Sequence, residues 1–115
     1  MNNAFFHFQR ITNGRDSRKI GNNTYAIKVA DDCYAIKLHN THVVTAYLDG
    51  RIVLDNGGWY SATTKNRMHE YLPNGVGVRQ AKGDWFVTVD QWQSTVPYRN
   101  GMTLMQDSTD KVTVR

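Results

Sequence analysis

The feature that most constrains the fold is a stretch of alternating apolar and polar residues between Thr24 and Trp59, TYAIKVADDCYAIKLHNTHVVTAYLDGRIVLDNGGW. Alternation with a period of two, interrupted by short polar turns, is typical of antiparallel strands that bury one face. We place two-residue turns at Asp31-Asp32, Asn40-Thr41 and Asp49-Gly50. This register predicts a four-strand meander with its apolar partners on one side: Val29 faces Tyr34, Ile27 faces Ile36, Tyr25 faces Leu38, Leu38 lies beside Val43 and Tyr47 lies beside Ile52.

A short helix is predicted after the meander, in the stretch GGWYSATTKNRMHEYL. Thr63 or Thr64 can cap its amino terminus, because a threonine hydroxyl accepts an otherwise unpaired backbone N–H. The helix ends before Pro73 and the turn that follows it. We expect Trp59 to fill the core beneath this helix, whose apolar face consists of Met68, Tyr71 and Leu72.

A second hairpin and a strand-rich tail complete the predicted fold. A turn at Lys82-Gly83 pairs Val78 with Val87 in GVGVRQAKGDWFVTVD, and weaker strands follow at residues 102–105 and 111–115. The fold class is therefore mostly β with one short helix: a twisted antiparallel meander, curled into a small barrel or sandwich that the helix closes. Residues 1–115 are expected to form a single domain, since 115 residues fit one hydrophobic core.

Composition excludes several classes of protein. No apolar run approaches the roughly 18 residues that span a bilayer, so no membrane contact is predicted. The first residues, MNNAFFHFQR, lack the pattern of a signal peptide, and we therefore expect a cytoplasmic protein. Cys33 is the only cysteine, so it forms no intramolecular disulfide and is expected to pack as a small apolar residue.

The charge of the chain points to an acidic partner. The formal net charge is +4, with a sequence pI of about 9.4, and the excess lies within residues 10–28. A local positive excess attracts phosphate or an acidic protein surface, although a solvated loop is the alternative. Aromatics between cations are also how small β-folds hold single strands. The candidate residues for binding nucleic acid or a partner are Arg10, Arg15, Arg18, Lys19, Lys28, Lys37, Lys65, Arg67 and Tyr60.

Two of these residues raise a separate hypothesis at the helix start. Lys65 and Arg67 follow the predicted cap, and helix N–H groups beside cations can form a site for a phosphate or carboxylate. The alternative is that the stretch is only the joint where a strand becomes a helix. Caps of this kind are common at ordinary helix starts, so the joint is sufficient to explain the stretch.

Catalysis and metal binding find weaker support. His39 and His42 flank the predicted Asn40-Thr41 turn and would face each other about 4.5 to 5.5 Å apart at Cβ, but a zinc site usually needs three or four donors. We therefore predict no metal and no cofactor. His69 with Lys65 or Arg67 supplies the residue types of phosphodiester cleavage. Glu70 would be the partner acid or base, but adjacent helical residues point in different directions, so His69 and Glu70 would not converge and the protein is expected to be non-enzymatic.

The chain resembles a family of small uncharacterised proteins of tailed bacteriophages and prophages. The resemblance covers residues 36–87 and lies in LHNTHVVT, DGRIVLDNGGW, TTKNRMHEYLP and KGDWFV. It implies a phage or mobile-element origin, and no catalytic residue is carried over with it. Small phage proteins of this size often bind host machinery, including antiviral nucleoproteins such as CRISPR effectors.

Three functions remain open at this point. The leading hypothesis is a phage accessory protein that binds nucleic acid or a host nucleoprotein and inhibits a host defence system. Its positive charge makes it a poor mimic of DNA. The second is a structural or assembly protein, or a homodimer, that pairs an edge strand of the tail from Met102 to Arg115. The third is the phosphodiester-cleaving enzyme.

Overall fold

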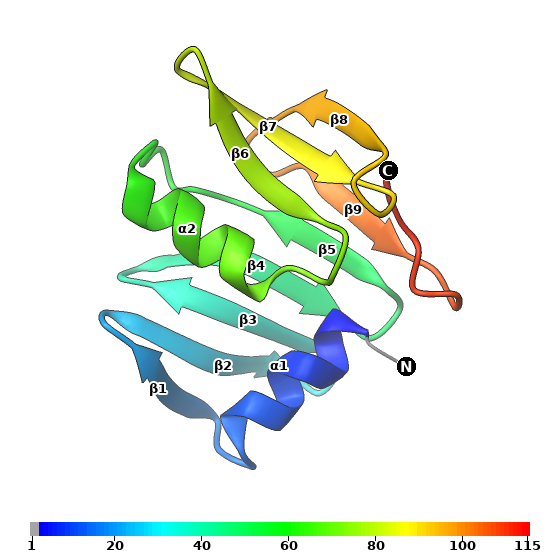
Figure 1. The fold of residues 1–115 in the computed structure, drawn as a ribbon. Helices are drawn as coiled ribbons and strands as arrows, with labels where there is room; N and C mark the ends of the chain where they lie inside the picture. The colour runs from blue at the N-terminus through cyan, green and yellow to red at the C-terminus, as the bar shows by residue number, and fades with distance from the viewer. Residues whose placement is uncertain (1–2) are drawn as a thin grey trace.

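Two helices and two antiparallel sheets make up the part of the chain that the structure describes, residues 3–115 of a computed structural model (Figure 1). The larger sheet has the strand order β1-β2-β3-β4-β5-β9-β10, and the smaller has the order β6-β7-β8. The elements are α1 (Ala4–Thr12), β1 (Ser17–Gly21), β2 (Thr24–Ala30), β3 (Cys33–Leu38), β4 (Thr41–Tyr47), β5 (Arg51–Leu54), α2 (Ala62–Tyr71), β6 (Gly77–Ala81), β7 (Asp84–Val89), β8 (Ser94–Pro97), β9 (Thr103–Gln106) and β10 (Val112–Val114).

The helices and the smaller sheet lie on the same face of the seven-stranded sheet (Figure 1). α1 contacts β1 to β4, α2 contacts β3, β4 and β6, and β7 contacts β10. One continuous core fills the space between these layers, and its most deeply buried side chains include Phe8, Ile36, Leu54, Met68 and Val87. The predicted mostly-β, antiparallel fold is confirmed, with a sandwich-like arrangement. The large sheet does not close into a barrel, because β1 and β10 remain its two edges.

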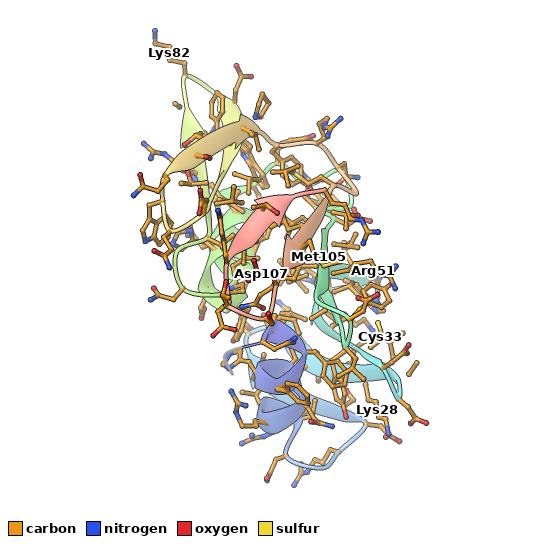
Figure 2. The ribbon with its side chains drawn as sticks, turned by 90° about the vertical axis from the view of Figure 1, so that its right-hand side faces the viewer. Lys28, Cys33, Arg51, Lys82, Met105 and Asp107 are labelled. Atoms are coloured by element: carbon orange, nitrogen blue, oxygen red, sulfur yellow. The ribbon has the colours of Figure 1, made fainter. Side chains whose placement is uncertain are left out.

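The other face of the large sheet is covered by no helix or strand of residues 3–115, and we call it the open face. Successive side chains of a strand point to opposite faces. Thus Thr24 and Ala26 are fully buried on the covered face, whereas Tyr25 and Ile27 are half-buried on the open face. Figure 2 shows the large sheet nearly edge-on, with Arg51 and Cys33 on the side away from α1.

The predicted meander is present, but its register differs from the prediction by one or two residues in each hairpin. Ile36 lies opposite Ala26 rather than Ile27, because the β2–β3 register shifts between Lys28 and Ala30. The same shift turns Val29 outward, where 48% of its surface is exposed. The predicted pairs Val29–Tyr34, Ile27–Ile36 and Tyr25–Leu38 are therefore wrong. In contrast, the β6–β7 hairpin has the predicted register, with Val78 opposite Val87.

The next two hairpins differ from the prediction because their turns lie elsewhere. The β3–β4 turn consists of His39 and Asn40, so Leu38 lies opposite Thr41 and not beside Val43. The β4–β5 connection has three residues, 48–50, so Ile52 lies opposite Ala46 rather than Tyr47. Here Gly50 takes a φ of +102°, a conformation that strongly favours glycine. Asp49-Gly50 therefore belongs to a three-residue loop rather than to the predicted two-residue turn.

Helix α2 begins two or three residues earlier than predicted, since its cap is Ser61 rather than Thr63 or Thr64, and it ends before Pro73 as predicted. Its N-cap is Ser61, whose hydroxyl accepts from the N–H of Thr64 at 3.2 Å. Met68 is buried under the helix, as predicted. Trp59, however, is not beneath it: 69% of its surface is exposed. The tight turn before the helix directs the indole outward, so that part of the prediction is wrong.

Three elements are absent from the sequence prediction. Residues 10–19, expected to form a loop, belong to α1, a turn and the edge strand β1. Strand β8 was also not predicted. Helix α1 is capped by Asn3, which accepts from the N–H of Phe5 at 2.7 Å. The helix is held to the sheet by the Ala4 N–H, which donates to Gln106 Oε1 at 3.1 Å.

Candidate nucleic-acid interface

A line of four side chains crosses the open face from the edge strand β1 to β4, and we call it the basic row. Lys19 lies opposite Tyr25, Tyr25 opposite Lys37, and Lys37 opposite His42. Directly opposite residues share a face and have Cβ atoms about 4.5 to 5.5 Å apart. The row therefore places one phenol ring between two ammonium groups. Lys19 is exposed, and the other three side chains are half-buried.

The two lysines of the basic row keep their charge available. None of the four ion pairs in residues 3–115 involves Lys19 or Lys37, so no carboxylate lies within 4.0 Å of either ammonium group. His42 ends the row as a neutral group at pH 7. Its pKa is lowered first by burial and then by the charge of Lys37, while Asp55 opposes the shift.

A second aromatic–cation pair lies on the same face, nearer the other edge of the sheet. The Arg51 guanidinium carbon is 4.2 Å from the centre of the Tyr47 ring, and its Nε donates to Asp49 Oδ2 at 2.8 Å. A carboxylate already neutralises this guanidinium. Cys33, opposite Tyr47, is buried, and burial raises the pKa of its thiol. The strip between this pair and the basic row is neutral: Ile27, Ala35, Thr45, Val53 and Thr103.

A cavity of about 500 Å³ opens at the end of the β3–β4 hairpin. It lies between residues 38–43 of that hairpin, Asn56 and Trp59 of the β5–α2 loop, and residues 61–64 at the start of α2. Hydroxyls and amides dominate the polar part of its lining, and no lysine, arginine or carboxylate belongs to it. His42, the last residue of the basic row, lies between two cavity residues on β4. The row and the cavity therefore lie on opposite sides of the same hairpin end.

The loop that presents Trp59 is fixed by its own hydrogen bonds. The Asn56 backbone N–H donates to Asn100 Oδ1 at 2.8 Å, and the Asn56 side chain accepts from the N–H of Gly58 at 2.8 Å. The Trp59 N–H donates to the Asn56 carbonyl at 2.9 Å. Gly57 lies so close to Thr41 that a side chain there would overlap the threonine hydroxyl. Only glycine fits this approach, which holds the loop against β4.

One comparison with known proteins identifies the chain. A model of the Kyanoviridae Gp96 protein family matches residues 6–105. The chain belongs to this phage protein family. The match confirms the phage resemblance seen in residues 36–87 and extends it over most of the sequence. The family's description states no activity, ligand or partner. No curated protein and no solved structure matches the chain.

In this Gp96-family chain, the cations predicted within residues 10–28 do not form one patch. Arg18 points to the covered face, where its Nη1 donates to the Ile11 carbonyl at 2.9 Å. Arg10 lines a small cavity with the end of α2, and Arg15 is exposed in the turn before β1. Lys28 pairs with Asp31 at 3.1 Å. Only Lys19 of this group lies on the open face.

The predicted residues of α2 also lie on the helix side. Lys65 Nζ donates to Gln80 Oε1 at 3.1 Å, and Arg67 Nε donates to Thr24 Oγ1 at 2.9 Å. Neither cation lines the cavity at the start of α2, so the predicted anion site lacks its charges. Tyr60 is 59% exposed and packs edge-on against Trp85 with ring centres 5.1 Å apart.

The histidines do not assemble the groupings considered from the sequence. His39 lies within the β3–β4 turn with a φ of +53°, and His42 lies opposite Lys37, so the two do not face each other across strands. Residues 3–115 hold no group of three or more His, Cys, Asp or Glu that could bind a metal. His69 Nδ1 accepts from the N–H of Val78 at 3.1 Å. Its ring faces β6, away from the partners of Arg67.

Sequence reasoning missed three residues of the open face and misplaced Trp59, which lines the cavity at the start of α2. Tyr25 and Tyr47 were treated as core partners, Arg51 was not singled out, and Trp59 was placed in the core. A correct hairpin register would have placed all three on the open face, where Tyr25 lies opposite Lys37, Tyr47 opposite Cys33 and Arg51 opposite Met105. No helix among residues 3–115 is long and apolar enough to cross a membrane.

Proposed function

We propose that this phage protein is a non-enzymatic accessory protein that binds single-stranded nucleic acid on the open face of its large sheet. The observation that carries the proposal is the basic row, in which Tyr25 lies between Lys19 and Lys37 and no carboxylate is close to either lysine. Aromatic rings beside cations on a sheet surface are the usual means by which small β-folds hold single strands.

Tyr25 supplies the contact with a base. Its ring is half-buried among neighbouring side chains and emerges on a face with no other layer above it. A ring held in this way loses little conformational freedom when a base stacks on it. Only an unstacked base can reach a ring that lies flush with a sheet, so the geometry favours a single strand over a duplex.

Lys19 and Lys37 supply the contacts with the backbone. They lie on strands that flank β2, so their Cα atoms are about 10 Å apart. Flexible lysine stems at this distance reach phosphates on both sides of a base stacked on Tyr25. His42, neutral at pH 7 because its pKa is lowered, adds a hydrogen-bonding ring rather than a charge. Arg51 is a weaker candidate because Asp49 already pairs with it at 2.8 Å.

The phage origin of the family supports a site of action inside the bacterial host. We extend the proposal to a single strand displayed by a host nucleoprotein in the bacterial cytoplasm, such as the displaced strand of a CRISPR effector. Covering that strand would inhibit the defence complex. The net charge of +4 favours binding to nucleic acid and argues against mimicry of nucleic acid, which requires negative charge.

Fluorescence anisotropy with a labelled oligodeoxythymidylate tests the proposal, with circular dichroism to confirm that each variant is folded. Tyr25→Ala should weaken binding by about 5- to 150-fold, which corresponds to the stacking of one base, and Tyr25→Phe should retain it. Tyr60→Ala is the matched control, because Tyr60 is an exposed tyrosine on the helix side. If Tyr60→Ala loses binding and Tyr25→Ala retains it, the interface lies on the helix side rather than on the open face, and the proposal is refuted.

The extension to a host nucleoprotein has its own test. Tagged protein is used to capture complexes from host lysate with and without nuclease, and Tyr25→Ala serves as the matched bait. The proposal predicts a defined nucleoprotein that nuclease releases and that the variant fails to retain. A complex that survives nuclease and is retained equally by both baits would contradict recognition through nucleic acid.

A further inference from the structure

We propose that the cavity at the end of the β3–β4 hairpin holds one unpaired base of the bound strand, stacked on Trp59. This inference rests on the proposed function and specifies it, because it names a second contact with the same ligand. It assigns the phosphates to the basic row and a base to the cavity. The stretch GGWYSATT is then a binding element as well as a joint between a strand and a helix.

The size and the lining of the cavity suit a neutral ring. Its volume of about 500 Å³ falls within the roughly 300–1,000 Å³ typical of small-molecule sites. Leu38 and Val43 supply apolar surface, whereas Thr41, Ser61 and Thr63 supply hydroxyls. A phosphate would require cations, and Lys65 and Arg67 are engaged elsewhere. A base requires a flat apolar contact and a few hydrogen bonds at its edge.

Trp59 supplies the flat contact. It lines the cavity, and 69% of its surface is exposed, so most of the indole is available to a ligand. The hydrogen bonds of Asn56 and the close contact of Gly57 with Thr41 hold the loop in place. The ring is thus presented by a fixed loop, which lowers the entropy lost on binding.

Two amides supply the edge recognition. Asn56 is fully buried in the cavity wall, and its Nδ2 has no hydrogen-bond acceptor among the described residues. Leaving a buried donor unpaired costs about 1 to 3 kcal/mol, so a ligand acceptor there would be favourable. Asn40, exposed at the β3–β4 turn, adds a second amide at the rim. Asparagine side chains offer both donors and acceptors to the edge of a base.

The cavity lies at the end of the hairpin that carries part of the basic row, but on the covered side of the sheet, because its lining includes Leu38, Val43 and the start of α2. Lys37 and His42 are the last opposed residues of the row before the β3–β4 turn, and each is adjacent in sequence to cavity residues: Leu38 follows Lys37, and Thr41 and Val43 flank His42. Neighbouring residues of a strand are about 3.3 Å apart. A strand whose phosphates contact Lys37 therefore has to bend around the end of the β3–β4 hairpin to place a base over Trp59.

The test compares an oligodeoxythymidylate with an oligonucleotide of equal length and charge that has abasic sites in place of its bases. Trp59→Ala should weaken binding of the first by about 5- to 150-fold and leave binding of the second unchanged. Trp92→Ala is the matched control, since Trp92 is also exposed, at 53%, but lies away from the cavity. Asn40→Ala, a change at an exposed turn, should weaken only the base-dependent binding.

The outcomes separate this inference from the proposed function. If Trp59→Ala binds the oligodeoxythymidylate as the parent does while Tyr25→Ala is weakened, the cavity does not hold a base and the proposed function stands. An equal loss on both oligonucleotides would also overturn the inference, because the indole would then contact the backbone. If thymidine alone quenches tryptophan fluorescence in the parent and not in Trp59→Ala, but no oligonucleotide binds, the cavity takes a free nucleoside and the proposed function fails.

Discussion

The basic row makes a quantitative prediction about the salt dependence of binding. Each phosphate contact on a single strand contributes a slope of about −0.7 to the plot of log affinity against log salt concentration. Replacing both Lys19 and Lys37 with glutamine should therefore make the slope shallower by about 1.4. Over a tenfold range of salt, from about 20 to 200 mM, the parent should lose about 25-fold more affinity than this double variant.

The matched control removes the same number of charges from the smaller sheet. Arg79 and Lys82 are exposed in the β6–β7 hairpin, and Figure 2 shows Lys82 at its far tip. Replacing both with glutamine lowers the net charge equally. These sites lie in the other sheet, so solvent screening over about 10 Å at 0.1 M salt leaves them little influence on the open face. The control slope should stay close to that of the parent.

Anisotropy titrations of a labelled oligodeoxythymidylate at several salt concentrations give both slopes directly. Urea unfolding of each variant checks that the fold is intact. Equal slopes for the two double variants would mean that only the total charge attracts the strand. A shallower slope in the Arg79/Lys82 variant alone would place the phosphate contacts on the smaller sheet. Either result refutes the reasoning from the basic row.

Three further predictions concern stability and assembly. Asn3→Ala removes the hydrogen bond to the Phe5 N–H and should lower the free energy of unfolding by about 1 kcal/mol, measured by urea titration. The pKa of His42 lies below 6.5 in the folded state, so the unfolded state binds a proton more readily. The contribution of His42 to the free energy of unfolding should be fully present above pH 6.5 and should decrease as the pH falls below 6.5. His42→Gln should flatten this dependence of the urea midpoint. Sedimentation should give the mass of a monomer, because the Val112 carbonyl on edge strand β10 already accepts from the Asp90 N–H at 2.9 Å; a stable dimer would return edge pairing to consideration.

Much of the fold follows from local patterns, and the errors have local causes. The β6–β7 hairpin was predicted with its register because Lys82-Gly83 forms a simple two-residue turn. The β2–β3 hairpin was shifted by one residue because its bulge, near Val29, leaves no signal in the alternation. Helix α1 was missed because its apolar face, with Phe5 and Phe8, is short and depends on the sheet beneath it.

The candidate site was less predictable than the fold. Composition drew attention to cations, yet only Lys19 and Lys37 among those named lie in the basic row. A one-residue change of register moves a side chain to the other face, so Tyr25 could not be placed without the bulge. Trp59 was assigned to the core because large aromatics are usually buried. Its outward direction depends on backbone turns at Gly57 and Gly58, both with positive φ.

The one-sided core divides the strands of the large sheet into two interleaved sets of positions. Residues such as Ile36, Ala46 and Ile52 hold the layers together, whereas most of their neighbours in the chain face outward. Ala35 is an exception, since adjacent side chains cover it completely. Along these strands, the inward-facing positions should therefore tolerate few substitutions, whereas the outward-facing positions between them should tolerate many. A phage lineage could change its recognition surface one outward-facing residue at a time while the fold is conserved.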